Sequence, residues 1–127
     1  MKALCVRQPY ATLIARGLKP LEIRTWRTAH RGDLVIAASA SYHETALAVM
    51  AKFGLRDEDC PRGVILCAVD LVDVRPTTRA DREPSCWPAC DAGFEAFVLE
   101  RPRALKQRPV RGKLNVFEIP DEWVETL

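Results

Sequence analysis

The sequence lacks the features that most often reveal a compartment or an activity. No apolar run approaches the ~20 residues that a membrane-spanning helix needs, and the chain opens with the strand-like Ala3–Val6 instead of the long apolar segment of a signal peptide. It contains no GxGxxG, Walker, HExxH or GxSxG motif and no internal repeat. We therefore expect a soluble, cytoplasmic protein without a membrane partner, and its function must be sought in less familiar patterns.

Candidate metal ligands are also scarce. The five cysteines are an odd number spread over expected strands and loops, which favours reduced thiols over disulfides. Cys86 and Cys90 are separated by one residue more than in a CxxC knuckle, and no second pair completes a set of four ligands. Neither His30 nor His43 lies at a ligand spacing from a cysteine. We expect no metal site and no cofactor.

The basic residues are concentrated at the two ends of the chain. With 127 residues, 48% hydrophobic and 28% charged, the chain has the size of one globular domain over residues 1–127. Residues 1–43 carry seven Lys or Arg against two acids, residues 44–100 carry six against eleven, and residues 101–127 carry six against four. If the first and last strands lie side by side, the basic ends form one positive face, which is typical of proteins that bind a polyanion.

Hydrophobic periodicity predicts many short strands and two helices early in the chain. The expected helices cover residues 9–17 and 42–53, the second capped by Ser41 and packed on the core. The expected strands are Lys2–Arg7, Leu21–Trp26, Leu34–Ala38, Gly63–Val74, Phe94–Leu99, a strand-like segment near Ala104–Arg108, and Leu114–Ile119. A long loop with one short helical turn is expected over residues 75–93. Because helices and strands do not alternate, a doubly wound sheet is disfavoured. We expect an α+β fold, a small, mostly antiparallel β-barrel of five to seven strands flanked by two or more helices.

The stretch from Gly17 to Trp26 holds the best candidate site. Strand alternation places Glu22, Arg24 and Trp26 on one face, with Lys19 just upstream at the corner between helix and strand. A carboxylate, a guanidinium and an indole in a row can hold a planar polar ligand. The alternative is an ordinary surface strand whose charges pair weakly in water, with Lys19 serving the negative end of the preceding helix.

The sequence resembles the ASCH domain family, within the folds similar to the PUA domain. The resemblance rests on Gln8-Pro9-Tyr10-Ala11, on Gly17, Lys19, Glu22, Arg24 and Trp26 in the arrangement GxKxxExRxW, on Arg31-Gly32, and on Val110-Arg111-Gly112-Lys113-Leu114. It implies a barrel of five to seven strands with helices around it, a cleft lined by the GxKxxExR residues, and an association with RNA binding.

Some positions depart from what such relatives have. Tyr10 stands where relatives often have Trp, and Ala37 where they often have a His. Relatives that resemble amidohydrolases acting on acylated cytidine pair a Lys with a hydroxyl residue three positions on, whereas this chain has Lys19 and Glu22. This difference counts against a hydrolase mechanism.

Two hypotheses of function follow, with binding ranked above catalysis. In the first, the domain binds RNA or single-stranded nucleic acid, or a nucleotide-like small molecule. The expected ligand-binding set is Lys19, Glu22, Arg24, Trp26, Tyr10 and Ser39, and the expected phosphate-binding rim is Arg7, Arg27, Arg31, Arg111 and Lys113. Either Tyr10 or Trp26 can stack a base; core packing is the alternative for each, and for Trp26 it is an equally good explanation.

In the second hypothesis the domain is a hydrolase that acts on acylated cytidine nucleosides or on RNA. Lys19 is then the nucleophile or general base, with its pKa lowered by burial, and Glu22 transfers a proton. The nearby carboxylate favours the charged lysine and so weighs against this. A partner-binding domain with a vestigial cleft has no specific support in the sequence.

Overall fold

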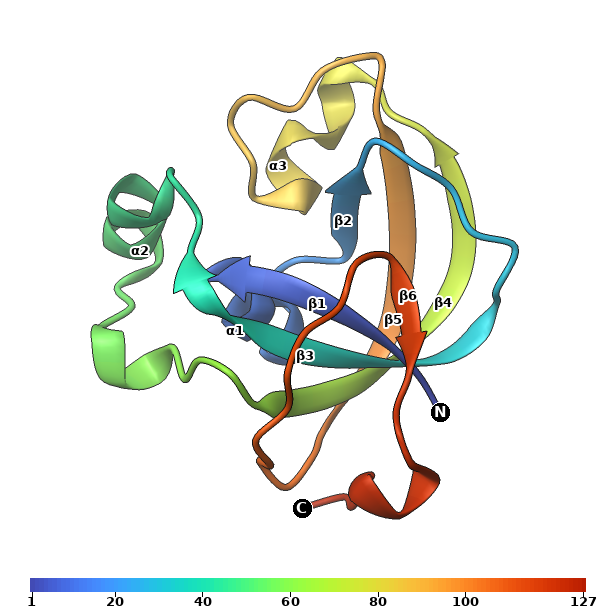
Figure 1. The fold of residues 1–127 in the computed structure, drawn as a ribbon. Helices are drawn as coiled ribbons and strands as arrows, with labels where there is room; N and C mark the ends of the chain where they lie inside the picture. The colour runs from blue at the N-terminus through green and yellow to red at the C-terminus, as the bar shows by residue number, and fades with distance from the viewer.

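A single curled sheet with short helices around it forms the molecule (Figure 1). The structure is a computed structural model that describes all residues 1–127. The strands are β1 (Lys2–Gln8), β2 (Leu21–Arg24), β3 (Gly32–Tyr42), β4 (Ile65–Pro76), β5 (Glu95–Ala104) and β6 (Val116–Glu118). The helices are α1 (Tyr10–Ala15), α2 (Ala46–Phe53) and α3 (Arg82–Ser85), with 3-10 turns η1 (Asp57–Asp59), η2 (Arg79–Asp81) and η3 (Asp121–Trp123). None of these helices is long and apolar enough to cross a membrane.

The strand order is β2-β5-β4-β3-β1-β6, and every neighbouring pair is antiparallel except β1 and β3. The expected α+β class and the mostly antiparallel sheet are therefore confirmed. The first and last strands do lie side by side, with Ala3 opposite Phe117. This pairing brings the two basic ends of the chain together.

The sheet does not close into the expected barrel. The two edge strands, β2 and β6, are not hydrogen-bonded to each other, because β2 is only four residues long and the chain leaves it at Arg24. In place of backbone pairing, one side chain crosses from β2 to β1: Nη2 of Arg24 donates to the carbonyl oxygen of Cys5 at 2.7 Å. The opening beside this contact is where the candidate site lies.

The apolar run of β3 is covered on both faces, as its composition predicts. Leu34, Ile36 and Ala38 enter the larger core cluster with Leu13 of α1, while Val35 enters a smaller cluster on the other face. Alternating side chains of one strand thus contact two separate apolar groups. Truncation of such fully buried residues typically costs about 2–5 kcal/mol, so β3 anchors the site that lies at its end.

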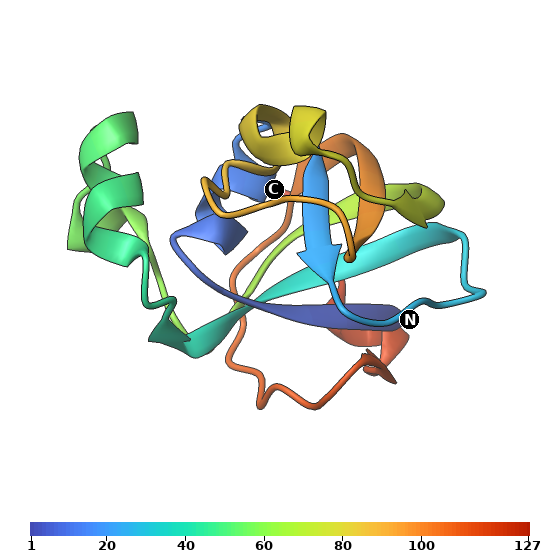
Figure 2. The same ribbon diagram turned by 90° about the horizontal axis from the view of Figure 1, so that it is seen from above.

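The second helix begins later than predicted. β3 continues through Tyr42, which pairs with Gln8 of β1, and the backbone N–H of His43 donates to the Gln8 carbonyl at 2.7 Å. Sheet pairing therefore outcompetes the expected cap at Ser41, and α2 begins only at Ala46. Figure 2 shows α2 at one side of the sheet, and Leu47 is 88% exposed. The other face of the helix packs on the core as expected, because Val49 is buried in the larger core cluster and Met50 and Phe53 pack against it.

The strand β5 and the segment before it contain more regular secondary structure than the sequence predicts. β5 extends to Ala104, so the expected break after Leu99 is absent; irregular register with β4 accommodates Arg101 at φ 49° within a continuous strand. The expected long loop contains η2 and α3. α3 lies near β2 (Figure 2), which places the carbonyl of Ser85 and the indole of Trp87 beside the site.

Candidate functional site

A cavity of about 1110 Å³ opens between β2, β1, the end of β3 and the segment 109–115. All six expected ligand-binding residues line it: Tyr10, Lys19, Glu22, Arg24, Trp26 and Ser39. Arg7, Arg111 and Lys113 of the expected rim line it as well. Its 23 lining residues include five Lys or Arg and a single carboxylate, Glu22, so the cavity is strongly positive.

Lys19 lies at the inner end of the cavity and is only 3% exposed. Gly17, at φ 77°, ends α1 in the left-handed conformation, and the backbone N–H groups of Leu18 and Lys19 both donate to the Leu13 carbonyl. This turn directs the Lys19 side chain inward. Its Nζ donates to the carbonyls of Leu21 at 2.7 Å and Ser85 at 2.5 Å.

The surroundings of the Lys19 amine match an ammonium group. Besides the two carbonyls, Oε1 of Glu22 lies 3.3 Å from Nζ, and the Tyr10 ring centroid lies at 4.9 Å. An ammonium has three N–H donors and no acceptor, so three acceptors satisfy it fully. Burial lowers the pKa of Lys19, while the Glu22 carboxylate opposes part of that fall.

Glu22 is held between two cations. Its Oε2 accepts from Nε of Arg24 at 2.9 Å and lies 2.8 Å from Nη2, while Oε1 faces Lys19. Burial raises the pKa of Glu22, but Arg24 and Lys19 outweigh it and keep the pKa of this carboxyl below its usual range. Glu22 is therefore an ionised counter-ion, and at 7% exposure it is buried, unlike a carboxylate on an ordinary surface strand.

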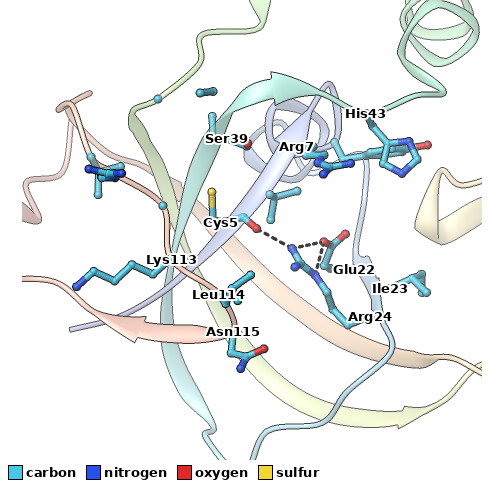
Figure 3. Close-up of a pocket in the computed structure, with 18 of the residues that line it drawn as sticks. Cys5, Arg7, Glu22, Ile23, Arg24, Ser39, His43, Lys113, Leu114 and Asn115 are labelled. Atoms are coloured by element: carbon cyan, nitrogen blue, oxygen red, sulfur yellow. Dashed lines mark hydrogen bonds and ion pairs between the residues drawn. The ribbon is translucent and has the colours of Figure 1, made fainter.

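Arg24 connects this buried pair to the open cavity (Figure 3). Dashed lines in the figure join its guanidinium to Glu22 and to the carbonyl oxygen of Cys5. These contacts fix the guanidinium plane, and they leave Nη1 without a protein partner. Trp26 lies beyond the end of β2 and packs edge-on against Phe97, with ring centroids 5.2 Å apart, so it both packs on the core and lines the cavity.

The basic rim divides into residues that line the cavity and residues that do not. Arg7, Arg111 and Lys113 are exposed and form no ion pair within the chain. In contrast, Arg27 contacts Glu95 at 2.6 Å and the Val74 carbonyl at 2.7 Å. Arg31 donates to the carbonyls of its own turn, at Thr28 and His30. The structure therefore does not bring Arg27 and Arg31 to the cavity.

Sequence reasoning missed His43, which lies beside Arg7 at the cavity (Figure 3). The backbone N–H of Thr45 donates to Nδ1 of His43 at 3.2 Å, so the neutral ring carries its proton on Nε2. Burial lowers the pKa of His43 and favours this neutral form. The ring thus offers a hydrogen-bond donor to a ligand, and no local spacing in the sequence indicates it.

Two indoles and an amide from distant segments were missed as well: Trp87, Trp123 and Asn115 line the cavity. Trp87 comes from the connection after α3, and Trp123 ends η3. Their places depend on contacts between segments far apart in the chain, which periodicity does not encode. No group of three or more His, Cys, Asp or Glu side chains is arranged to hold a metal ion.

Comparison with known proteins identifies the domain. A family model described as the ASCH domain matches residues 4–109. Human activating signal cointegrator 1 is 32% identical to this chain over an alignment of 127 residues. The match covers 91% of this chain and 22% of that protein. The mouse protein of the same name is 28% identical with the same coverage. The chain thus spans about a fifth of the length of these curated relatives.

Solved structures agree on the fold. ASCH from Zymomonas mobilis superposes with a TM-score of 0.65 at 10% identity, over 95% of this chain and 88% of that one. A tyrosine-to-phenylalanine variant of the same protein gives 0.60 at 9% identity, over 95% and 91%. At such identities the likeness shows the fold alone. Because the family model covers most of the chain, the resemblance inferred from the motifs is confirmed, and the chain belongs to the ASCH domain family with its PUA-like fold.

Proposed function

We propose that this domain binds single-stranded nucleic acid, with RNA as the first candidate, by admitting a nucleotide into the cavity. The observation that carries the proposal is the composition of the cavity, with five cations against one carboxylate and with indole and phenol groups in its walls. Cations that neutralise phosphates, together with aromatic rings that stack bases, are the usual means of binding single strands. Arg7, Arg111 and Lys113 are free for this role because no carboxylate of the chain occupies them.

The contacts support Arg24, not Glu22, as the group that reads the ligand. Both oxygens of Glu22 already face cations, so the carboxylate is poorly placed to accept from an exocyclic amine. Nη1 of Arg24 and Nε2–H of His43 are unsatisfied donors at the cavity. The ligand edge that meets them must therefore present acceptors, such as a base carbonyl, a ring nitrogen or a phosphate oxygen.

Fluorescence anisotropy with labelled single-stranded RNA tests this proposal. Arg24→Lys keeps the charge but removes the planar donor fork, so we expect affinity to fall about tenfold or more, as for loss of a charge-assisted hydrogen bond worth about 1.5–3 kcal/mol. Arg27→Lys is the matched control, because Arg27 bonds to Glu95 outside the cavity. Absence of RNA binding by the unaltered protein in 50 mM salt, or equal losses in both variants, would refute the proposal.

Hydrolysis of an acylated cytidine or of RNA is the alternative, and one observation favours it. Burial lowers the pKa of Lys19, as a lysine nucleophile or base requires. The three acceptors around Nζ weigh against it, because they stabilise the ammonium and block the lone pair. Turnover of N-acylated cytidine or RNA that disappears in a folded Lys19→Met variant would reverse the ranking of the two functions.

A further inference from the structure

The outer part of the cavity is built by a segment that the family match does not include. The match ends at residue 109, yet Arg111, Lys113, Asn115 and Trp123 all line the cavity. In Figure 1, η3 lies at the end of the molecule opposite α3, and the cavity takes Trp87 from beside α3 and Trp123 from η3. The cavity therefore runs along the molecule between two aromatic residues.

The size of the cavity exceeds what a single small ligand fills. Sites for drug-sized molecules usually enclose about 300–1000 Å³, compared with about 1110 Å³ here. The Glu22–Arg24 pair occupies one part of it, beside Cys5 (Figure 3). In the remainder, toward Trp123, the recognition described above uses only the cations Arg111 and Lys113 and gives no specific role to the indole of Trp123.

Trp123 packs against the smaller core cluster and has a cation over its ring. It is half-buried, and the guanidinium carbon of Arg108 lies 4.4 Å from its ring centroid. The Arg108 backbone is fixed, because its carbonyl accepts from the Ile65 N–H at 2.9 Å. Arg108 and Arg111 are exposed and have no carboxylate partner, whereas the nearby Asp121 pairs with the N-terminal ammonium at 2.6 Å.

Gly112 holds the segment close to the sheet. A Cβ at this position would lie 2.5 Å from Sγ and 3.2 Å from Cβ of Cys5, so only glycine allows the backbone to pass so near β1. The side chains on both sides of Gly112 are exposed, and Figure 3 shows Lys113 directed away from the Glu22–Arg24 pair. The segment is thus a basic wall that passes close to β1 at Gly112.

We propose that residues 108–123 form a second nucleotide subsite, in which a base stacks on Trp123 while Arg108 and Arg111 contact the adjoining phosphate. This inference rests on the proposed function and extends it: the domain binds at least two successive nucleotides, one beside Arg24 and one on Trp123. Aromatic residues at both ends and cations between them suit a strand that lies along the cavity.

The experiment compares fluorescein-labelled single-stranded RNA of one, two, three and four nucleotides by anisotropy. For the unaltered protein, affinity should rise with length by about 5- to 150-fold beyond one nucleotide, which corresponds to the contribution of one stacked base. Trp123→Leu should remove most of this gain, so that the affinities for one and for four nucleotides approach each other, while Trp123→Phe should retain the gain.

Variants of charge provide a second measurement that leaves the indole of Trp123 in place. Arg108→Gln should reduce the gain with length, whereas Lys106→Gln, whose side chain pairs with Glu125 outside the cavity, should not. If mononucleotides bind but length adds nothing, or if the gain survives in both Trp123→Leu and Arg108→Gln, the second subsite is refuted and the proposed function stands. If no RNA of any length binds, both inferences fail together.

Discussion

Replacement of Glu22 by glutamine tests whether a buried counter-ion organises the site. The amide keeps the shape of the side chain but removes the charge that faces Lys19 at 3.3 Å and Arg24 at 2.8 Å. Removal of one partner of a buried ion pair costs about 3–5 kcal/mol, because the other charge remains buried. Lys19 keeps two carbonyl acceptors and Arg24 keeps the Cys5 carbonyl, so we expect the lower end, about 3 kcal/mol.

Urea unfolding at pH 7 measures this loss. With a slope of about 2 kcal/mol per molar urea, typical of small proteins, the midpoint should fall by about 1.5 M. The matched control is Glu95→Gln, which removes a more exposed pair with Arg27 and should cost about 0.2–1 kcal/mol. A Lys19→Met change made together with Glu22→Gln should recover part of the loss, because it removes the stranded ammonium.

The loss of stability caused by Glu22→Gln should depend on pH. Arg24 and Lys19 hold the pKa of Glu22 below its usual range despite burial, so its folded-state pKa is below its unfolded value of about 4.3. The carboxylate then contributes stability that is fully present above that value and is lost as the pH falls through the folded pKa. The difference in stability between the unaltered protein and Glu22→Gln should therefore be full at pH 7 and shrink below about pH 4. A difference no larger than that of Glu95→Gln at pH 7, or one independent of pH, would show that Glu22 is not the counter-ion of Lys19.

Two further predictions concern the basic wall. Arg111→Gln should flatten the dependence of log affinity for single-stranded RNA on log salt by about 0.7, the effect of one lost phosphate contact; Arg27→Gln should leave the slope unchanged, and equal slopes in both would place the phosphates elsewhere. Gly112→Ala should destabilise the domain by about 1–3 kcal/mol through overpacking against Cys5 and weaken RNA binding. Adding Cys5→Ala should restore much of the stability measured by thermal unfolding, and failure of this rescue would contradict the close approach at Gly112.

The grouping of Lys19, Glu22 and Arg24 was predictable because it depends on local geometry. A glycine that ends a helix and a strand that begins a few residues later bring these side chains together whatever the rest of the chain does. Their burial was not predictable in this way. It depends on the carbonyl of Ser85, which is 66 residues from Lys19 in the chain and accepts from its Nζ.

Long-range pairing also explains the errors in the fold. Alternation in β1 and β6 correctly indicated strands, and their pairing joins the chain ends. A closed barrel requires a second strand to hydrogen-bond to the free edge of β2. β2 has only four residues, and no strand of the sheet pairs with that edge. Composition correctly indicated that α2 packs on the core through Val49, but the extension of β3 to Tyr42 delays the start of the helix to Ala46. Neither outcome is encoded by the residues of the element itself.

The open edge of the sheet and the buried ion pair are two aspects of one arrangement. Because β2 does not pair with β1, the polar groups between them need other partners, and Nη2 of Arg24 supplies one to the Cys5 carbonyl. Arg24 reaches that carbonyl in a fixed orientation because Glu22 holds Nε, and Glu22 is itself held by Lys19. Replacing Glu22 by a hydroxyl residue would leave both cations without a counter-ion and free the guanidinium to rotate. In this chain Lys19 and Glu22 therefore hold Arg24 in position. Under our proposal that Arg24, and neither Lys19 nor Glu22, meets the ligand, Glu22→Gln should lower ligand binding as much as Arg24→Lys does.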